Sequence, residues 1–251
     1  MSQPIWRACD GPRWIDLIQG TLHRLVESQE HIATLGYVDT LEEQALLEAM
    51  LEDSKPPYRA GGGRDHYLLR TPFRYPPLPW GSRFGRRHEP GILYGGLDVA
   101  ATLAESAYYR FVFRYSMGGS PPEGSIHSQH TLFSVGYKTD QGVRLHQPPF
   151  DQYQARLTHP LDYADTQALG ASMREAGVQA FEYPSARDPA RGLCAGLFVP
   201  QALAQRRPRD MHPWLCETGA HEVSFKQVGS PRVISYGVGN FLVDGRLPMP
   251  A

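Results

Sequence analysis

The feature that most constrains the fold is a series of short strand-like runs, rich in β-branched and aromatic residues, between glycine-, proline- and polar-rich segments. Runs of this length and texture are typical of strands and too short for average helices. The predicted strands cover 92–94, 131–137, 143–145, 178–183, 193–199, 222–228 and 232–236. Many short strands with few helices predict an α+β fold built on a sheet core.

Helices are predicted before and within this region. Apolar residues from Ile15 to Leu35 recur near helical spacing, which predicts an amphipathic helix. A second helix begins at Thr40, where Thr40 and Glu43 have capping-box spacing. This helix is expected to bury four apolar residues, Leu41, Leu46, Leu47 and Met50. Two further helices are expected, one capped by Asp98 and one within 161–177.

The chain length suggests one domain with an addition. At 251 residues the chain is long for one average domain and short for two. The stretch 55–80 holds a triple glycine and many prolines and is predicted to be an irregular connection, and 118–124 is predicted to be a loop. We therefore expect an N-terminal helical extension with its connection at 1–77 and a catalytic domain at 78–251.

Composition excludes several classes of protein. A net charge of −1 argues against a protein that binds nucleic acid through phosphate contacts. The three cysteines, Cys9, Cys194 and Cys216, are odd in number and widely spaced, which predicts reduced thiols. No apolar run approaches the roughly 18 residues of a membrane span, and the N-terminus does not resemble a signal peptide. A cytoplasmic protein without membrane contact is the expectation.

Common cofactor and catalytic motifs are missing from the sequence. It contains no G-x-x-x-x-G-K-[ST] phosphate loop, no G-x-G-x-x-G dinucleotide fingerprint and no G-x-S-x-G nucleophile turn. His127 and His130 have a spacing that could hold a metal, but no third ligand accompanies them. No metal site is therefore predicted, and the loop residues Arg86, Arg87 and His88 are expected to be solvated.

Four short motifs occur in a fixed order. They are Arg83-Phe84, Leu93-Tyr94-Gly95-Gly96, the helical run from Ala100 to Glu105, and Tyr183-Pro184-Ser185-Ala186-Arg187. This ordered set resembles the RES-domain family, the toxin halves of bacterial toxin–antitoxin pairs, over about residues 79–199. The sequence departs from the family pattern in two places. It has Gly95-Gly96 where small residues such as Ala-Ser are frequent, and it carries a long N-terminal extension over about residues 1–77.

The resemblance implies both fold and activity. It implies an ADP-ribosyltransferase-like mixed sheet and an enzyme that degrades NAD⁺ by phosphorolysis or hydrolysis. NAD⁺ would be the substrate, inorganic phosphate a possible co-substrate, and no cofactor would be needed. It also implies a cognate helix-turn-helix (Xre-type) antitoxin and an oligomeric complex, with no direct binding of nucleic acid.

Each motif residue has a role that suits this chemistry. Cleavage of the glycosidic bond builds positive charge on the ribose, which the carboxylate of Glu105 can stabilise. Arg83 can bind the pyrophosphate or an attacking phosphate through two donors. Tyr94 offers a ring and a hydroxyl to the nicotinamide ribose. Ser185 can bind a ribose or phosphate oxygen, and Arg187 either contacts an anion or braces the turn.

Two other functions stay open at this level. A protein-modifying ADP-ribosyltransferase would use the same pocket, because the acceptor is not encoded in the NAD⁺ site. A non-enzymatic interaction module would instead use the N-terminal helices and the proline-rich stretch 72–79, and would tolerate changes at Arg83 and Glu105.

Overall fold

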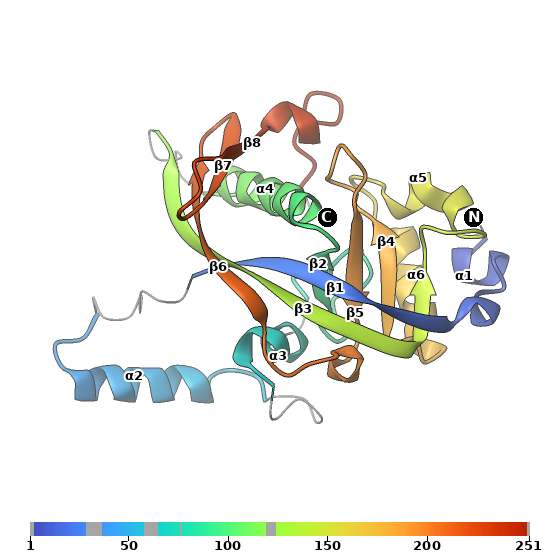
Figure 1. Ribbon diagram of the computed structural model, residues 1–251, viewed down its shortest axis with the longest axis horizontal. Helices are drawn as coiled ribbons and strands as arrows, with labels where there is room; N and C mark the ends of the chain where they lie inside the picture. Colours follow the sequence, from blue (N-terminus) through green and yellow to red (C-terminus); the bar gives the residue numbers. More distant parts are fainter. Residues whose placement is uncertain (1–2, 29–36, 58–64, 76, 119–123, 250–251) are drawn as a thin grey trace.

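The computed structural model describes residues 3–28, 37–57, 65–75, 77–118 and 124–249. Its centre is a sheet of eight strands with the order β1-β2-β5-β4-β3-β6-β7-β8 (Figure 1). The strands are β1 (Asp16–Glu27), β2 (Leu93–Gly96), β3 (Ile126–Arg144), β4 (Ala180–Pro184), β5 (Leu193–Leu197), β6 (Arg209–Thr218), β7 (Glu222–Gln227) and β8 (Val233–Gly237). The predicted α+β class is confirmed.

One extra pairing closes part of this sheet on itself. Strand β1 pairs with β2 at its middle and with β3 over almost its whole length, both antiparallel. Strands β1, β2, β5, β4 and β3 therefore form a closed ring, and β6, β7 and β8 extend from β3. Only the β3–β4 pairing is parallel among the described strands.

Helices flank the sheet on several sides (Figure 1). The longer ones are α2 (Leu41–Asp53), α3 (Tyr67–Arg74), α4 (Val99–Tyr115) and α6 (Ala164–Glu175). Short helical turns complete the chain: α1 (Ile5–Ala8), η1 (Gly11–Trp14), η3 (Asp151–Tyr153), α5 (Gln154–Leu157), η4 (Pro200–Ala202) and η5 (Val238–Phe241). As predicted, Asp98 caps α4, because its side chain accepts the N–H of Ala101 at 2.7 Å.

Two apolar clusters fix the helices that matter most for the motif residues. Helix α4 packs through Leu103 and Phe111 against Trp214 and Phe225 of β6 and β7. Helix α6 belongs to a second cluster that includes its Leu169 and Met173 and also Phe84 and Phe181, with all four of these side chains almost fully buried. The motif residues on α4, β2 and β4 are therefore held by packed elements on both sides of the sheet.

The predicted helix over 15–35 is wrong where the structure describes it. Residues 16–27 form strand β1, while 29–35 lie outside the described residues. Ile18 and Leu22 are completely buried. A separation of four places two residues on one face of a helix and also on one face of a strand, so this spacing does not separate the two. The segment forms a strand because it pairs with β3 along almost its whole length.

The second predicted helix forms, but not with the predicted burial. Thr40 accepts the N–H of Glu43, and the Glu43 side chain accepts the N–H of Thr40, which completes the capping box. Three of the four residues expected to be buried are exposed: Leu41 (78%), Leu46 (62%) and Met50 (61%). Leu47 is half-buried. The apolar residues of α2 therefore do not pack into the main core.

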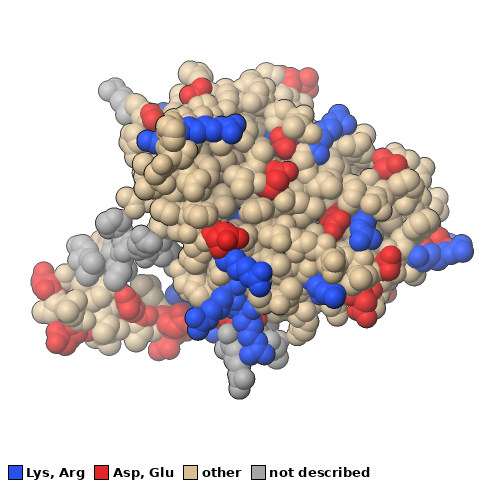
Figure 2. Space-filling view, viewed as in Figure 1, with Lys and Arg blue, Asp and Glu red and all other residues tan. Residues whose placement is uncertain are grey.

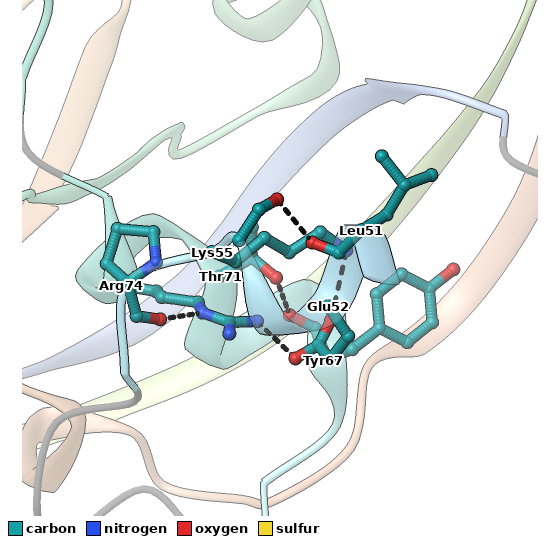
Figure 3. Close-up of polar contacts among 8 residues, drawn as sticks. Leu51, Glu52, Lys55, Tyr67, Thr71 and Arg74 are labelled. Atoms are coloured by element: carbon teal, nitrogen blue, oxygen red, sulfur yellow. Dashed lines mark hydrogen bonds and ion pairs between the residues drawn. The ribbon is translucent and has the colours of Figure 1, made fainter. Parts of the chain in front are cut away.

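The stretch 55–80 is more regular than predicted, since it contains α3. Figure 3 shows how α3 holds the end of α2: Arg74 pairs with Glu52 at 2.7 Å and also donates to the carbonyl of Pro56. Lys55 pairs with the same carboxylate at 3.0 Å. The triple glycine lies outside the described residues, as does most of the loop predicted at 118–124.

The remaining strand predictions differ in two places. The runs 131–137 and 143–145 are parts of one long strand, β3. Strand β6 is absent from the prediction because half of its residues are polar, it contains Pro213, and most of its side chains are exposed. The helix predicted within 161–177 and the strands predicted at 92–94, 178–183, 193–199, 222–228 and 232–236 are confirmed with shifts of a few residues at their ends.

The surface shows no single dominant charge. Figure 2 shows acidic and basic side chains interspersed over most of the face in view, with one group of basic side chains near its lower centre. Within the ranges that the structure describes, no helix has the length and apolar character needed to cross a bilayer.

Candidate active site

Arg83 lies in a tight turn between the N-terminal segment and β2. Ser82 and Gly85 bond each other through their backbone groups, at 2.7 and 3.3 Å. The hydroxyl of Tyr94 on β2 accepts the N–H of Phe84 at 3.1 Å and shares a hydrogen bond with the hydroxyl of Ser82 at 3.0 Å. Gly170 of α6 lies directly under this turn, because a β-carbon there would overlap the carbonyl oxygen of Phe84. The turn is thus fixed from both sides.

These contacts give Tyr94 a structural role, which is to hold the turn that contains Arg83, in addition to the predicted contact with a ligand. Burial raises the pKa of Tyr94 to about 12, so its hydroxyl stays protonated at neutral pH. The hydroxyl is committed to the Arg83 turn, whereas the ring is half-buried. Contact of Tyr94 with a ligand stays a prediction; its hydroxyl is already hydrogen-bonded to Ser82 and Phe84.

Tyr94→Phe is expected to destabilise the protein by about 1–2 kcal/mol, because the N–H of Phe84 loses its acceptor in a buried setting. Chemical unfolding of the two proteins measures this difference. Tyr115→Phe is the matched control, since the exposed Tyr115 hydroxyl donates to the carbonyl of Ala220, and its loss is expected to stay within about 0.5 kcal/mol. Equal losses in both variants would contradict the bracing role of Tyr94.

Arg83 is 9% exposed, and its guanidinium forms hydrogen bonds to described residues at one end only. Its Nη1 donates to the carbonyl oxygens of Leu157 (3.4 Å) and His159 (2.9 Å). Its central carbon, Cζ, lies over the ring of Tyr163, 4.5 Å from the centroid. Nε and Nη2 form no hydrogen bond with any described residue. This pair of donors is the edge of a guanidinium that binds two oxygens of one anion side by side.

Glu105 projects from α4 and meets Ser185, which follows β4. The Ser185 hydroxyl donates to Oε1 of Glu105 at 2.5 Å. The same hydroxyl oxygen accepts the backbone N–H groups of Arg187 (3.1 Å) and Asp188 (3.0 Å). One donor and two acceptor positions are all that a serine hydroxyl has. All three hydrogen-bonding positions of the Ser185 hydroxyl are therefore used, one on the Glu105 carboxylate and two on the backbone. The second oxygen of Glu105 bonds no described residue.

The buried ring of Tyr183 joins these parts. It contacts Phe84 beside the arginine turn, with ring centroids 4.9 Å apart, and Tyr94 at 6.2 Å. Burial raises the pKa of Tyr183, the charge of Glu105 raises it further, and the charge of Arg83 lowers it. Tyr183 thus contacts Tyr94 and the neighbour of Arg83, and the charges of Glu105 and Arg83 both act on its hydroxyl.

Arg187 is the most constrained of the predicted site residues. It is 4% exposed, and its Nη2 donates to the carbonyl of Pro160 (2.8 Å) and to the hydroxyl of Tyr163 (3.0 Å). Its guanidinium also lies over the ring of Tyr108, at 3.6 Å from the centroid. These contacts favour the interpretation in which Arg187 braces the serine turn, and anion contact by this residue stays a prediction.

Two neighbouring aromatic residues, Tyr163 and Tyr108, have no counterpart in the sequence prediction. Tyr163 follows a loop without a recognisable motif, and Tyr108 fits an ordinary buried helical stripe. Tyr163 also lines a hollow of about 410 Å³ together with Leu161, Asp162, Ala164 and Gln167. A larger groove of about 670 Å³ lies elsewhere, on β3, β6 and β7, and contains none of the motif residues.

Other predictions of the sequence can be placed as well. Arg86, Arg87 and His88 are exposed, as expected of a solvated loop. His127 is exposed and His130 is buried, and burial lowers the pKa of His130 to about 4. Among the residues with a described position, no three His, Cys, Asp or Glu side chains cluster in a way that could hold a metal ion. The three cysteines are free and buried.

One family model matches the chain. The family model described as the RES domain matches residues 56–218, which is more than half of the chain. No curated protein matches. Among solved structures, the chain is similar to one in the crystal structure of the M. tuberculosis MbcT–MbcA toxin–antitoxin complex, with 12% identity and a TM-score of 0.49 over 84% of this chain and 91% of that one.

Proposed function

Because the chain belongs to the RES-domain family, we propose that it is an enzyme that breaks the nicotinamide–ribose bond of NAD⁺ and that it acts as the toxin of a toxin–antitoxin pair. The observation that carries this proposal is a pair of charged motif residues, a carboxylate held in place by a serine and a guanidinium with two donors that bond no described residue, both of which act on the pKa of the buried Tyr183. Glu105 is held by Ser185 at 2.5 Å, and Arg83 keeps Nε and Nη2 without a described partner.

The carboxylate suits the bond that breaks. When the bond between nicotinamide and C1 of its ribose cleaves, the electron pair leaves with the nicotinamide and the ribose becomes an oxocarbenium ion. A negative group already in place stabilises that charge without reorganising. The free oxygen of Glu105 would face the sugar, while the oxygen bonded to Ser185 fixes the orientation.

The capture step restores the atom balance. An oxygen of inorganic phosphate bonds to the ribose carbon in phosphorolysis and yields ADP-ribose 1-phosphate. In hydrolysis, water bonds there instead and releases a proton, which yields ADP-ribose. The free edge of Arg83 can bind either the pyrophosphate of the substrate or the attacking phosphate, because both offer two oxygens to parallel N–H donors. Both capture routes remain within the proposal.

A toxin of this kind needs an inhibitor in the cell that makes it. We propose a cognate helix-turn-helix antitoxin of the Xre type that covers the site, in an oligomeric complex. Family membership supports this part of the proposal. Expression of the chain alone is expected to arrest bacterial growth and deplete cellular NAD⁺, and co-expression of the antitoxin is expected to restore both.

The direct experiment incubates the purified protein with NAD⁺, with and without inorganic phosphate, and follows release of nicotinamide. Release only with phosphate identifies phosphorolysis, and release in both conditions identifies hydrolysis. Label retained on a protein band, when labelled NAD⁺ is added to a cell lysate, would identify protein ADP-ribosylation instead. No release under any condition, with Glu105→Gln unchanged from the parent in cells, would overturn the proposal.

A further inference from the structure

Tyr163 stands between the two arginines of the site and touches each with a different part of its side chain. Its ring lies under the guanidinium of Arg83 at 4.5 Å. Its hydroxyl accepts Nη2 of Arg187 at 3.0 Å. Tyr163 is 5% exposed, so both contacts are shielded from water and are stronger than they would be at the surface.

The ring contact determines which edge of Arg83 is presented. Two carbonyl oxygens, of Leu157 and His159, bond only Nη1, so these hydrogen bonds alone do not fix the plane of the guanidinium. The aromatic face of Tyr163 removes this rotation, because the cation is attracted to the face of the ring and lies over it. The plane of the guanidinium, and with it the direction of Nε and Nη2, is thus set by Tyr163.

The hydroxyl contact acts on the other half of the site. Arg187 is anchored through its side chain to Pro160 and Tyr163, and its backbone N–H donates to the Ser185 oxygen. That oxygen in turn carries the proton donated to Glu105. A weaker anchor for Arg187 would loosen the turn from which Ser185 holds the carboxylate.

We infer that Tyr163 is a positioning residue that orients the anion-binding edge of Arg83 with its ring and steadies the Glu105 carboxylate, through Arg187 and Ser185, with its hydroxyl. This inference rests on the proposed function and deepens it. It assigns substrate binding and bond cleavage to two separable parts of one side chain. A residue that only filled space in the core would not separate them.

Two substitutions test the ring and the hydroxyl of Tyr163 separately. Tyr163→Phe keeps the ring and removes the acceptor, whereas Tyr163→Gln removes the ring and keeps an oxygen acceptor. For Tyr163→Gln we expect the KM for NAD⁺ to rise about tenfold with a smaller change in kcat. For Tyr163→Phe we expect kcat to fall about threefold to tenfold with KM within about twofold of the parent.

Tyr153→Gln is the matched control, since the guanidinium of Arg156 lies over the Tyr153 ring at 5.4 Å but belongs to no part of the site. This variant is expected to leave KM and kcat unchanged. Thermal unfolding of all variants identifies any loss of folded protein, and if Tyr163→Gln does not fold, the kcat and KM of Tyr163→Phe still test the hydroxyl role.

The outcomes separate this inference from the proposed function. A parent protein that does not release nicotinamide overturns both. An active parent, combined with Tyr163 variants that lower kcat and raise KM by the same factors or that match Tyr153→Gln, overturns only the role given to Tyr163. A rise confined mainly to KM in Tyr163→Gln, together with a fall confined mainly to kcat in Tyr163→Phe, supports it.

Discussion

Replacing Glu105 with glutamine is expected to lower the rate of nicotinamide release from NAD⁺ by about 100- to 1,000-fold, the usual cost of removing one preorganised electrostatic contact to a transition state. The amide has almost the same shape and still offers an oxygen to the Ser185 hydroxyl, which donates to Oε1 at 2.5 Å. The change therefore removes the charge and keeps the packing. Release of nicotinamide under saturating NAD⁺ measures the effect on kcat.

Ser185→Ala provides an internal comparison for this result. The charge of Glu105 remains, but its oxygen loses the donor, and the N–H groups of Arg187 and Asp188 lose their acceptor. A loss of activity smaller than that of Glu105→Gln is expected, because the carboxylate can still reach the sugar. Full activity in Glu105→Gln would show that the negative charge has no part in the reaction.

Replacing Leu22 with alanine is expected to lower the free energy of unfolding by about 2–5 kcal/mol, the range for a leucine truncated in a core. Leu22 is completely buried at the middle of β1, next to Gly95 of β2. Because β1 closes the ring of strands between β2 and β3, this loss acts on the same sheet that carries the site. Urea unfolding measures this loss in the free energy of unfolding, with the same m-value expected for both proteins.

Leu17→Ala on the same strand is the control, because Leu17 is 44% exposed. Its loss is expected to stay below about 1 kcal/mol. Equal losses at positions 17 and 22 would contradict the different burial of these two side chains. Hydrogen exchange offers a second measurement, since the N–H groups of β1 are expected to be protected together with those of β3.

The N-terminal third shows where local patterns do not determine structure. The spacing of four between Ile18 and Leu22 fits a helix and a strand equally well. The deciding partner, β3, lies more than a hundred residues away in the sequence. By contrast, the capping box of Thr40 and Glu43 is a local hydrogen-bond pattern, and α2 begins where it predicts. The exposure of α2 was not predictable, because burial depends on what the rest of the chain brings near.

The division between 1–77 and 78–251 stays a prediction. The family match begins at residue 56, and β1 contributes a strand to the sheet that holds the motif residues. A domain boundary depends on which contacts cross it. Here the contacts of β1 are backbone hydrogen bonds to β2 and β3, and nothing in the sequence of residues 16–27 identifies those partners.

The sequence by itself determined the α+β class, most of the strands, the Asp98 cap, and the four ordered motifs that identify the family, because each depends on residue types at short, fixed spacings. Only the tertiary structure decided that the Ser185 hydroxyl bonds Glu105, that Nε and Nη2 of Arg83 bond no described residue, and that Tyr163 contacts both arginines. These arrangements join residues 24 to 80 positions apart in the sequence. A hydrogen bond or a ring contact between such residues exists only after the strands and helices that carry them have packed together.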